Sequence, residues 1–140
     1  MKIGILCGSF DLLHQGHLNL IRRAKRRCDI LLVGVNSDEY IRQNKGHKPV
    51  LPQKTRCNLV KELRDVTAAY IIENGMSFVQ TMIRVGVKID EYYRGDDARG
   101  CESQIAENKF LVANNIKPVY FKYTKNISST KIRTKIQTGV

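Results

Sequence analysis

Continuous apolar runs mark the chain at regular intervals. The clearest lie within residues 2–7, where Ile3-Gly4-Ile5-Leu6 is apolar, and at 30–35, where every residue is apolar. Runs of this kind are typical of strands covered on both faces, as in a parallel sheet. Shorter segments of the same character follow later in the chain. The strands that the pattern predicts cover residues 2–7, 30–35, 68–72, 91–94 and 119–121.

A second periodicity separates these strands. Leu18, Ile21, Ala24 and Cys28 recur at spacings of three and four, which predicts a helix with one apolar stripe. Between 36 and 53 the pattern weakens to a short helical turn at 38–41 and an exposed basic loop at 43–49. Further helices are predicted at 54–63, at 77–85 with Ser77 as its cap, at 103–114, and from 131 after several hydroxyl residues.

Repeated alternation of strand and helix predicts an α/β fold. The 140 residues suit one doubly wound domain, residues 1–140, with about five parallel strands. In such a fold the right-handed crossovers place the loops that follow the strands at one edge of the sheet, where ligands bind. Functional residues are therefore expected in those loops.

Composition narrows the function classes. The net charge of +11 predicts attraction to anions, although the run Arg22–Arg27 is interpreted as a solvated helix face. Without an aromatic RNA-binding platform or a zinc or helix-turn-helix signature, nucleic acid is not an expected partner. No apolar stretch or leader pattern suggests a membrane, so a cytoplasmic protein is expected. Four scattered cysteines indicate neither a disulfide framework nor zinc.

The segment Cys7–His17, C-G-S-F-D-L-L-H-Q-G-H, has the features of a phosphate site. A strand ends at Gly8, a second glycine follows at 16, and a helix begins near His17. Backbone N–H groups and the positive end of a helix would meet there and attract anions. His14 and His17, one helical turn apart, could converge on one ligand. Three other polar, glycine-bearing or basic loops are expected at the same edge: 45–48, 95–100 and 126–130.

The motif G-S-F-D-L-L-H-Q-G-H resembles the signature of the HxGH nucleotidylyltransferase superfamily, and I-S-S-T-K-I-R resembles its second phosphate motif. With R-G-D-D between them, the whole chain is most similar to cytidylyltransferases of the glycerol-3-phosphate type. The resemblance implies a Rossmann-like fold, a homodimer, and transfer of CMP from CTP to a small phosphorylated alcohol with release of pyrophosphate. It also implies a role in making precursors of cell-envelope polysaccharide or teichoic acid.

The chemistry that the resemblance implies needs positioning and electrostatic stabilisation rather than a covalent nucleophile. His14 and His17 would donate hydrogen bonds to phosphate oxygens, and Lys45 would lie over the reacting phosphates. Asp11 is expected to order its loop rather than act as a base. The expected nucleotide-binding residues are Gly8, Ser9, Phe10, Asp11, Gly16, Gly95, Asp96, Asp97, Ile127, Ser128, Ser129 and Thr130. The expected acceptor-binding residues are Lys48, Arg56 and Arg64.

The chain departs from the family pattern in places. Tyr123 replaces a common arginine, so Lys122 or Lys125 would contact the triphosphate instead. R-D-V-T at Arg64 is also unusual, and no aromatic residue follows Asp96 and Asp97. Mg²⁺ is expected as a cofactor carried in with the triphosphate, without a dedicated carboxylate cage.

Two alternatives stay open. The segment Val33–Asp38, with the Lys45-Gly46 pair and Pro49, also resembles the adenylyltransferase domain for heptose phosphate. That domain would use ATP and a sugar phosphate in the same chemistry. A more distant alternative is a non-catalytic nucleotide- or nucleic-acid-binding module.

Overall fold

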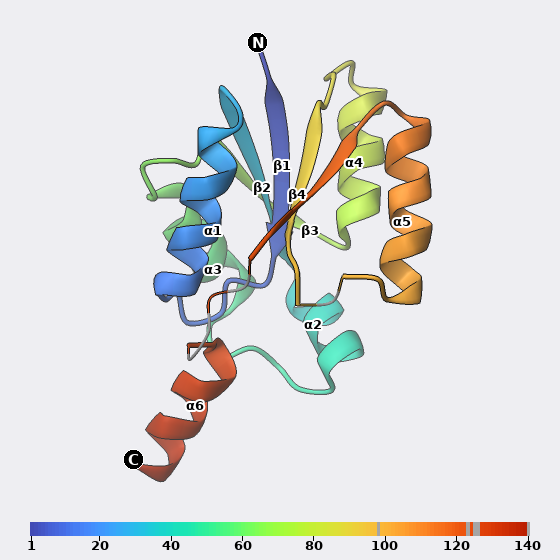
Figure 1. Cartoon of the computed structure of the whole chain (residues 1–140). Coiled ribbons are helices and arrows are strands. Elements are labelled where there is room, and N and C mark those ends of the chain that lie inside the picture. The colour runs from blue at the N-terminus through green and yellow to red at the C-terminus, as the bar shows by residue number, and fades with distance from the viewer. Residues whose placement is uncertain (98, 123, 125–126, 140) are drawn as a thin grey trace.

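The computed structural model describes residues 1–97, 99–122, 124 and 127–139. Within these ranges five strands form one parallel sheet in the order β3-β2-β1-β4-β5, with helices on both faces (Figure 1). The predicted α/β fold and its five parallel strands are confirmed. The strands are β1 Ile3–Gly8, β2 Ile30–Asn36, β3 Ala68–Ile72, β4 Glu91–Gly95 and β5 Lys117–Phe121.

The helices follow the expected periodicity with two differences. The weak segment contains a full helix from Asp38 to Lys45, which begins at the Ser37 cap and ends at Gly46 in the left-handed region. Ser77 does not cap the fourth helix, because Asn74 does so by accepting from the Ser77 N–H. The helices are α1 Gln15–Arg26, α2 Asp38–Lys45, α3 Gln53–Lys61, α4 Gly75–Arg84, α5 Glu102–Ala113 and α6 Ser129–Thr138.

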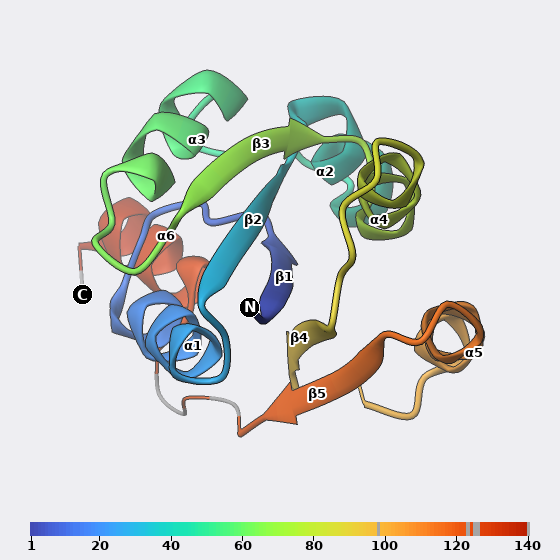
Figure 2. The same ribbon diagram turned by 90° about the horizontal axis from the view of Figure 1, so that it is seen from above.

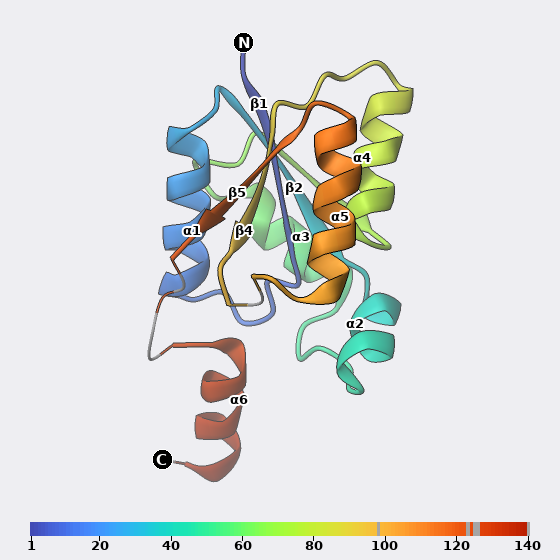
Figure 3. The same cartoon turned by 45° about the vertical axis from the view of Figure 1, so that its right-hand side comes forward.

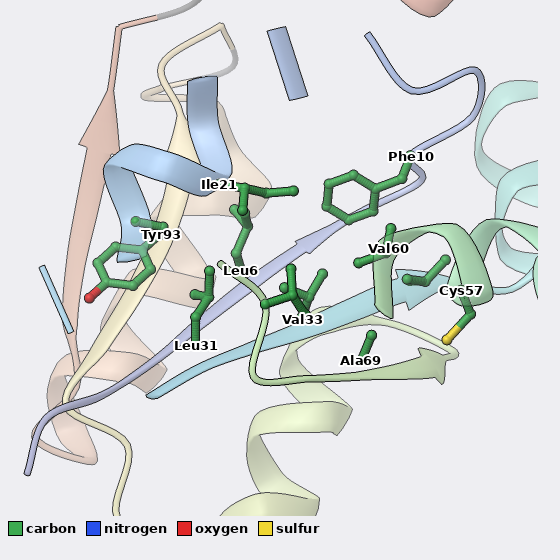
Figure 4. Close-up of a cluster of buried hydrophobic side chains, with 12 residues drawn as sticks. Leu6, Phe10, Ile21, Leu31, Val33, Cys57, Val60, Ala69 and Tyr93 are labelled. Carbon is green, nitrogen blue, oxygen red and sulfur yellow. The ribbon is translucent and has the colours of Figure 1, made fainter. Parts of the chain in front are cut away.

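The sheet separates two apolar layers. Leu6 and its neighbours on one face pack against α1 and α3, whereas Ile5 and the alternate residues pack against α4 and α5 (Figures 2 and 4). This alternation is the two-residue period of a strand buried on both sides. Helices α2 and α6 lie beyond the carboxyl edge of the strands (Figure 3). None of the helices described is long and apolar enough to cross a membrane.

A buried carboxylate, Glu91, forms several hydrogen bonds at the amino edge of the sheet. Glu91 of β4 accepts two hydrogen bonds from Arg27, at 3.0 and 2.8 Å, and one from the Tyr93 hydroxyl at 3.0 Å. Burial alone would raise the pKa of Glu91, but these donors and Lys2 lower it to about 2. Arg27 therefore does not belong to a solvated helix face as the sequence suggested.

A buried arginine organises the carboxyl edge. Arg56 of α3 has no exposed surface, and its guanidinium donates to the carbonyls of Leu51, Ser9 and Asn36 at 2.7–2.9 Å. A fourth bond of 2.6 Å reaches the Asp38 carboxylate. The sequence assigned Arg56 to acceptor binding, and this is wrong. Its donors are engaged in joining the ends of β1 and β2 to the segments around α2 and α3.

Replacing Glu91 with Gln should lower the free energy of unfolding at pH 7 by about 1–3 kcal/mol, because the Arg27 donors lose a buried anion. The wild type should lose up to about 3 kcal/mol from this carboxylate as the pH falls from 4.5 towards 2, since only the folded form keeps it ionised there. The variant should lose correspondingly less. Urea unfolding at pH 7 and pH 2.5 measures both, with Glu39→Gln, in an exposed ion pair, as the matched control.

Replacing Arg56 with Met should lower the free energy of unfolding by about 3 kcal/mol or more, because three carbonyls and one carboxylate lose their donor. The exposed Arg64 is the control, and Arg64→Met should leave the denaturation midpoint unchanged. A stable Arg56→Met protein with only an altered acceptor KM would restore the assignment to acceptor binding.

Candidate functional site

Residues from separate loops meet in a cavity of about 400 Å³ at the carboxyl edge of the sheet. The loop after β1, the end of α2, the end of β4 and the start of α6 all contribute. Leu20, Lys122 and Thr124 also line it, and of these only Lys122 was expected from the sequence. The site residues that it brings together are His14, Gly16, His17, Lys45, Gly95, Asp97, Ile127, Ser128, Ser129 and Thr130.

A second cavity of about 430 Å³ adjoins the first. His17, Leu20, Lys45, Ser129 and Thr130 line both cavities. The expected residues found only in the second cavity are Gly8, Ser9, Phe10 and Asp11. Cys7 and His47 also line only this cavity and fall within the segments 7–17 and 45–48 that the sequence placed at this edge, whereas Ile41 and Arg133 were not expected. The nucleotide-binding residues that the sequence predicted are therefore divided between two connected spaces.

The two motif histidines begin helix α1 by capping it. The Gly16 N–H donates to Nδ1 of His14 at 3.0 Å, and the His14 N–H donates to Nδ1 of His17 at 3.2 Å. The rings stack with their centroids 3.8 Å apart. Since both Nδ1 atoms accept, the ring proton of each neutral imidazole is on Nε2. The two side chains thus present N–H donors of known position.

Both imidazoles are held in the neutral form. Burial lowers the pKa of His17 to about 4, with further lowering by His14 and Lys45 that Asp11 partly opposes. Burial also lowers the pKa of His14. At neutral pH the pair therefore acts as two dipolar donors, and the positive charge beside them comes from Lys45 and the N-terminal ends of the helices.

Asp11 orders the loop after β1. Its carboxylate accepts the backbone N–H of Val50 at 2.9 Å and of Leu51 at 3.0 Å. The side chain is buried, and its contacts hold the loop against the segment before α3. Residues on either side of it, Phe10 and Leu12, both have φ of 52°, a left-handed conformation that costs energy for side chains other than glycine. The structure thus shows the ordering role that the sequence predicted for Asp11.

Helix α6 brings its N-terminus to both cavities. Ser128 caps it by accepting from the Lys131 N–H at 3.0 Å, and the Ser129 hydroxyl donates to the Asp11 carbonyl. Arg133 Nη1 lies 3.6 Å from the Asp11 carboxylate. Asn126, which the sequence included in this loop, lies outside the described residues.

The end of β4 contributes predicted nucleotide-binding residues to the first cavity. Asp97 and Gly95 line it, whereas Asp96 does not, and the Asp96 N–H donates to the Phe121 carbonyl. Lys122 lines it as expected, and Tyr123 and Lys125 lie outside the described residues. Leu20 and Thr124 also line this cavity but were not predicted, because the sequence signals for them are weak. Leu20 follows His17 by three positions on the same helix face, and Thr124 is held by Asn19 Nδ2 at 3.3 Å.

Two predicted acceptor residues lie elsewhere. Lys48 lines a different groove, of about 350 Å³, beside Asp38, Glu39 and Arg42. Arg64 lies between α3 and the start of β3, and therefore at the amino edge of the sheet, where it lines a groove along α1. The sequence predicted acceptor binding for Arg64, and this position does not bring it to either of the connected cavities. That groove also contains Arg22, Lys25 and Arg26.

The Asp97 carboxylate at the first cavity suits an Mg²⁺ ion that would arrive bound to the triphosphate. Asp97 supplies a carboxylate to the first cavity, but the described residues contain no group of three or more His, Cys, Asp or Glu placed to hold a metal. Phosphate oxygens would have to provide most ligands of an Mg²⁺ ion, which prefers oxygen and keeps much of its hydration. The cofactor therefore remains a prediction tied to the triphosphate.

The curated relatives that this chain matches include several called bifunctional protein HldE. The protein from Nitratiruptor sp. is 37% identical over 109 residues, 75% of this chain and 23% of that protein. The protein from Desulfatibacillum aliphaticivorans is 27% identical over 139 residues, 99% of this chain and 27% of that protein. The chain thus spans about a quarter of the length of these relatives.

Solved structures show the same arrangement. The lipopolysaccharide core biosynthesis protein from Thermoplasma volcanium aligns with a TM-score of 0.73 and 27% identity, over 89% of this chain and 99% of that one. Pantoate-beta-alanine ligase from Francisella tularensis has a TM-score of 0.66 at 17% identity, over 99% of this chain and 68% of that one, which shows the shared fold alone.

The sequence itself matches one family over nearly its whole length. Residues 5–135 match the family described as cytidylyltransferase-like. Together with the paired imidazoles beside a helix N-terminus, this match supports a nucleotidyltransferase. The chain belongs to the cytidylyltransferase-like family.

Proposed function

We propose that the protein transfers a nucleotidyl group from a nucleoside triphosphate to a phosphorylated acceptor and releases pyrophosphate. One observation carries the proposal: His14 and His17 start helix α1 beside the first cavity with a ring proton on each Nε2, and His17 also lines the second cavity. A nucleotide and an acceptor need separate spaces that meet at the α-phosphate. The shared wall of the cavities supplies such a meeting point.

The reaction is an in-line displacement at the α-phosphorus. An oxygen of the acceptor phosphate forms the new bond to phosphorus as the bond to pyrophosphate breaks, and negative charge gathers on the α-phosphate oxygens. The two neutral imidazoles donate hydrogen bonds to those oxygens, and Lys45 adds a positive charge. These donors are already oriented before the substrate binds, which is the condition for strong transition-state stabilisation.

The other contacts position the nucleotide. The N-terminus of α6, with Ser128, Ser129 and Thr130, is suited to the β- and γ-phosphates through its N–H groups and hydroxyls. Gly95, Asp96 and Asp97 belong to the nucleoside side in this proposal. Mg²⁺ bound to the triphosphate would neutralise part of its charge.

The identity of the nucleotide and acceptor belongs to the proposal. Adenylyl transfer to a sugar phosphate, heptose phosphate in the first instance, is favoured by the HldE relatives and by the lipopolysaccharide core biosynthesis protein of T. volcanium. Cytidylyl transfer to glycerol 3-phosphate is the second candidate, and the R-G-D-D motif at the end of β4 favours it. A homodimer remains a prediction from the family resemblance.

Incubation with each nucleotide and acceptor in turn should identify the pair. ATP with a heptose phosphate is expected to release pyrophosphate, and CTP with glycerol 3-phosphate is the competing combination. Coupled detection of pyrophosphate, with product mass by mass spectrometry, measures the outcome. Turnover with CTP alone would reject the adenylyl assignment, and nucleotide binding without pyrophosphate from any combination would reject the transferase itself.

Substitutions that keep the helix cap separate folding from catalysis. His14→Asn and His17→Gln retain a cap acceptor but lose the imidazole Nε2 donor. Each should lower turnover at least 100-fold, about 3 kcal/mol of transition-state stabilisation, with a nearly unchanged unfolding midpoint.

The alanine variants at these positions provide the comparison. His14→Ala and His17→Ala should lose similar turnover and in addition about 1 kcal/mol of stability, because the α1 cap is broken. Steady-state kinetics and urea unfolding test all four proteins. Near-normal kcat in His14→Asn and His17→Gln would show that the pair serves the fold alone.

A further inference from the structure

The second cavity has the charge expected of a site for an anion. Its carboxylate, Asp11, is already engaged by the Val50 and Leu51 N–H groups and lies near Arg133. Lys45 and His47 also line the cavity, and in the part of the chain that the structure describes neither forms an ion pair. The remaining wall includes apolar side chains of Phe10, Leu20 and Ile41.

His47 is oriented by its own loop. Its Nδ1 lies 3.0 Å from the Lys48 carbonyl, and because a carbonyl can only accept, Nδ1 carries a proton. Nε2 is then the atom left for a ligand. The loop is fixed three and four residues later, where Val50 and Leu51 bind Asp11. The β1–α1 loop, which contains Asp11 and ends at the His14 cap of α1, therefore also helps to set the position of His47.

The neighbouring residue lies in a different environment. Lys48 lines the groove that contains Asp38, Glu39 and Arg42, and it does not line either of the connected cavities. Two basic residues adjacent in sequence thus serve different surfaces. The sequence alone favoured Lys48 for the acceptor phosphate, and the geometry favours His47.

We propose that His47, together with Lys45, binds the phosphate of a phosphomonoester acceptor in the second cavity. That the phosphomonoester is the acceptor rests on the proposed function, whereas its binding to His47 and Lys45 does not. In this contact Nδ1 donates to the Lys48 carbonyl and Nε2 donates to the phosphate. Lys48 has no part in this contact.

Kinetics of His47→Ala and Lys48→Ala test the assignment with two variants of one loop. With the acceptor that the substrate panel identifies, His47→Ala should raise the acceptor KM at least tenfold and leave the nucleotide KM within twofold. Lys48→Ala should leave both constants within twofold. An equal effect of the two variants, a larger effect of Lys48→Ala, or a rise in nucleotide KM alone for His47→Ala would overturn the proposal.

Imidazole NMR provides a readout that does not need turnover. The chain has three histidines, so the His47→Ala spectrum identifies the His47 signals by their absence. Glycerol 3-phosphate and glucose 1-phosphate are titrated as probes, with glycerol and glucose as uncharged controls. A shift of His47 with the phosphates alone supports the site even if pyrophosphate is never released. Unmoved His47 signals in a protein that turns over would reject the inference and leave the proposed function intact.

Discussion

The Arg56 guanidinium is the interaction on which the whole ligand-binding edge depends. A charged group without any exposed surface is tolerated only where it is paired and hydrogen-bonded, and Arg56 has one carboxylate and three carbonyls around it. Those carbonyls belong to the residue after β1, to the last residue of β2 and to the segment that precedes α3. One side chain therefore holds in register the loops from which the histidines and the α2 end project.

This constraint allows the loop after β1 to keep an unfavourable conformation. Phe10 and Leu12 lie in the left-handed region, which costs on the order of 1 kcal/mol or more for each residue. The Phe10 ring is 2% exposed and packs in the core beside α3 (Figure 4). Core packing, Arg56 and Asp11 together offset the strain. The result is a rigid turn that delivers the chain to the His14 cap.

Much of the fold could be predicted from the sequence because strands that are buried on both faces consist of continuous apolar runs. Leu31 to Val35 are apolar throughout since neither face meets water. The extent of α2 was missed because Ile41 is its one buried residue, although the Ser37 cap and Gly46 were readable signals. Arg56 was assigned to a ligand rather than to the fold, because its three carbonyl partners come together only in the tertiary structure.

The site was predictable to the extent that its residues follow strand ends. His14, His17, Lys45 and Ser128 to Thr130 meet because the carboxyl ends of parallel strands share an edge. The mutual capping of the two imidazoles was not predictable, since histidine is not a usual cap residue. Arg64 was misplaced because its position before β3 sends it to the other edge. His47 and Lys48 are adjacent in sequence but line different cavities, which a loop sequence does not reveal.

Helix α6 has a consequence for affinity. No side chain of this helix is buried. Within the described residues, the Ser129 hydroxyl donates to the Asp11 carbonyl, and Arg133 forms an ion pair with the Asp11 carboxylate. The helix therefore contributes little to the core, yet its N-terminus lines both cavities, where the proposed function places the phosphates. Any fraction of time that it spends undocked weakens the apparent affinity in proportion. Substitutions on its solvent-facing turns, which touch no ligand, would then tune nucleotide binding through the docking equilibrium of the helix.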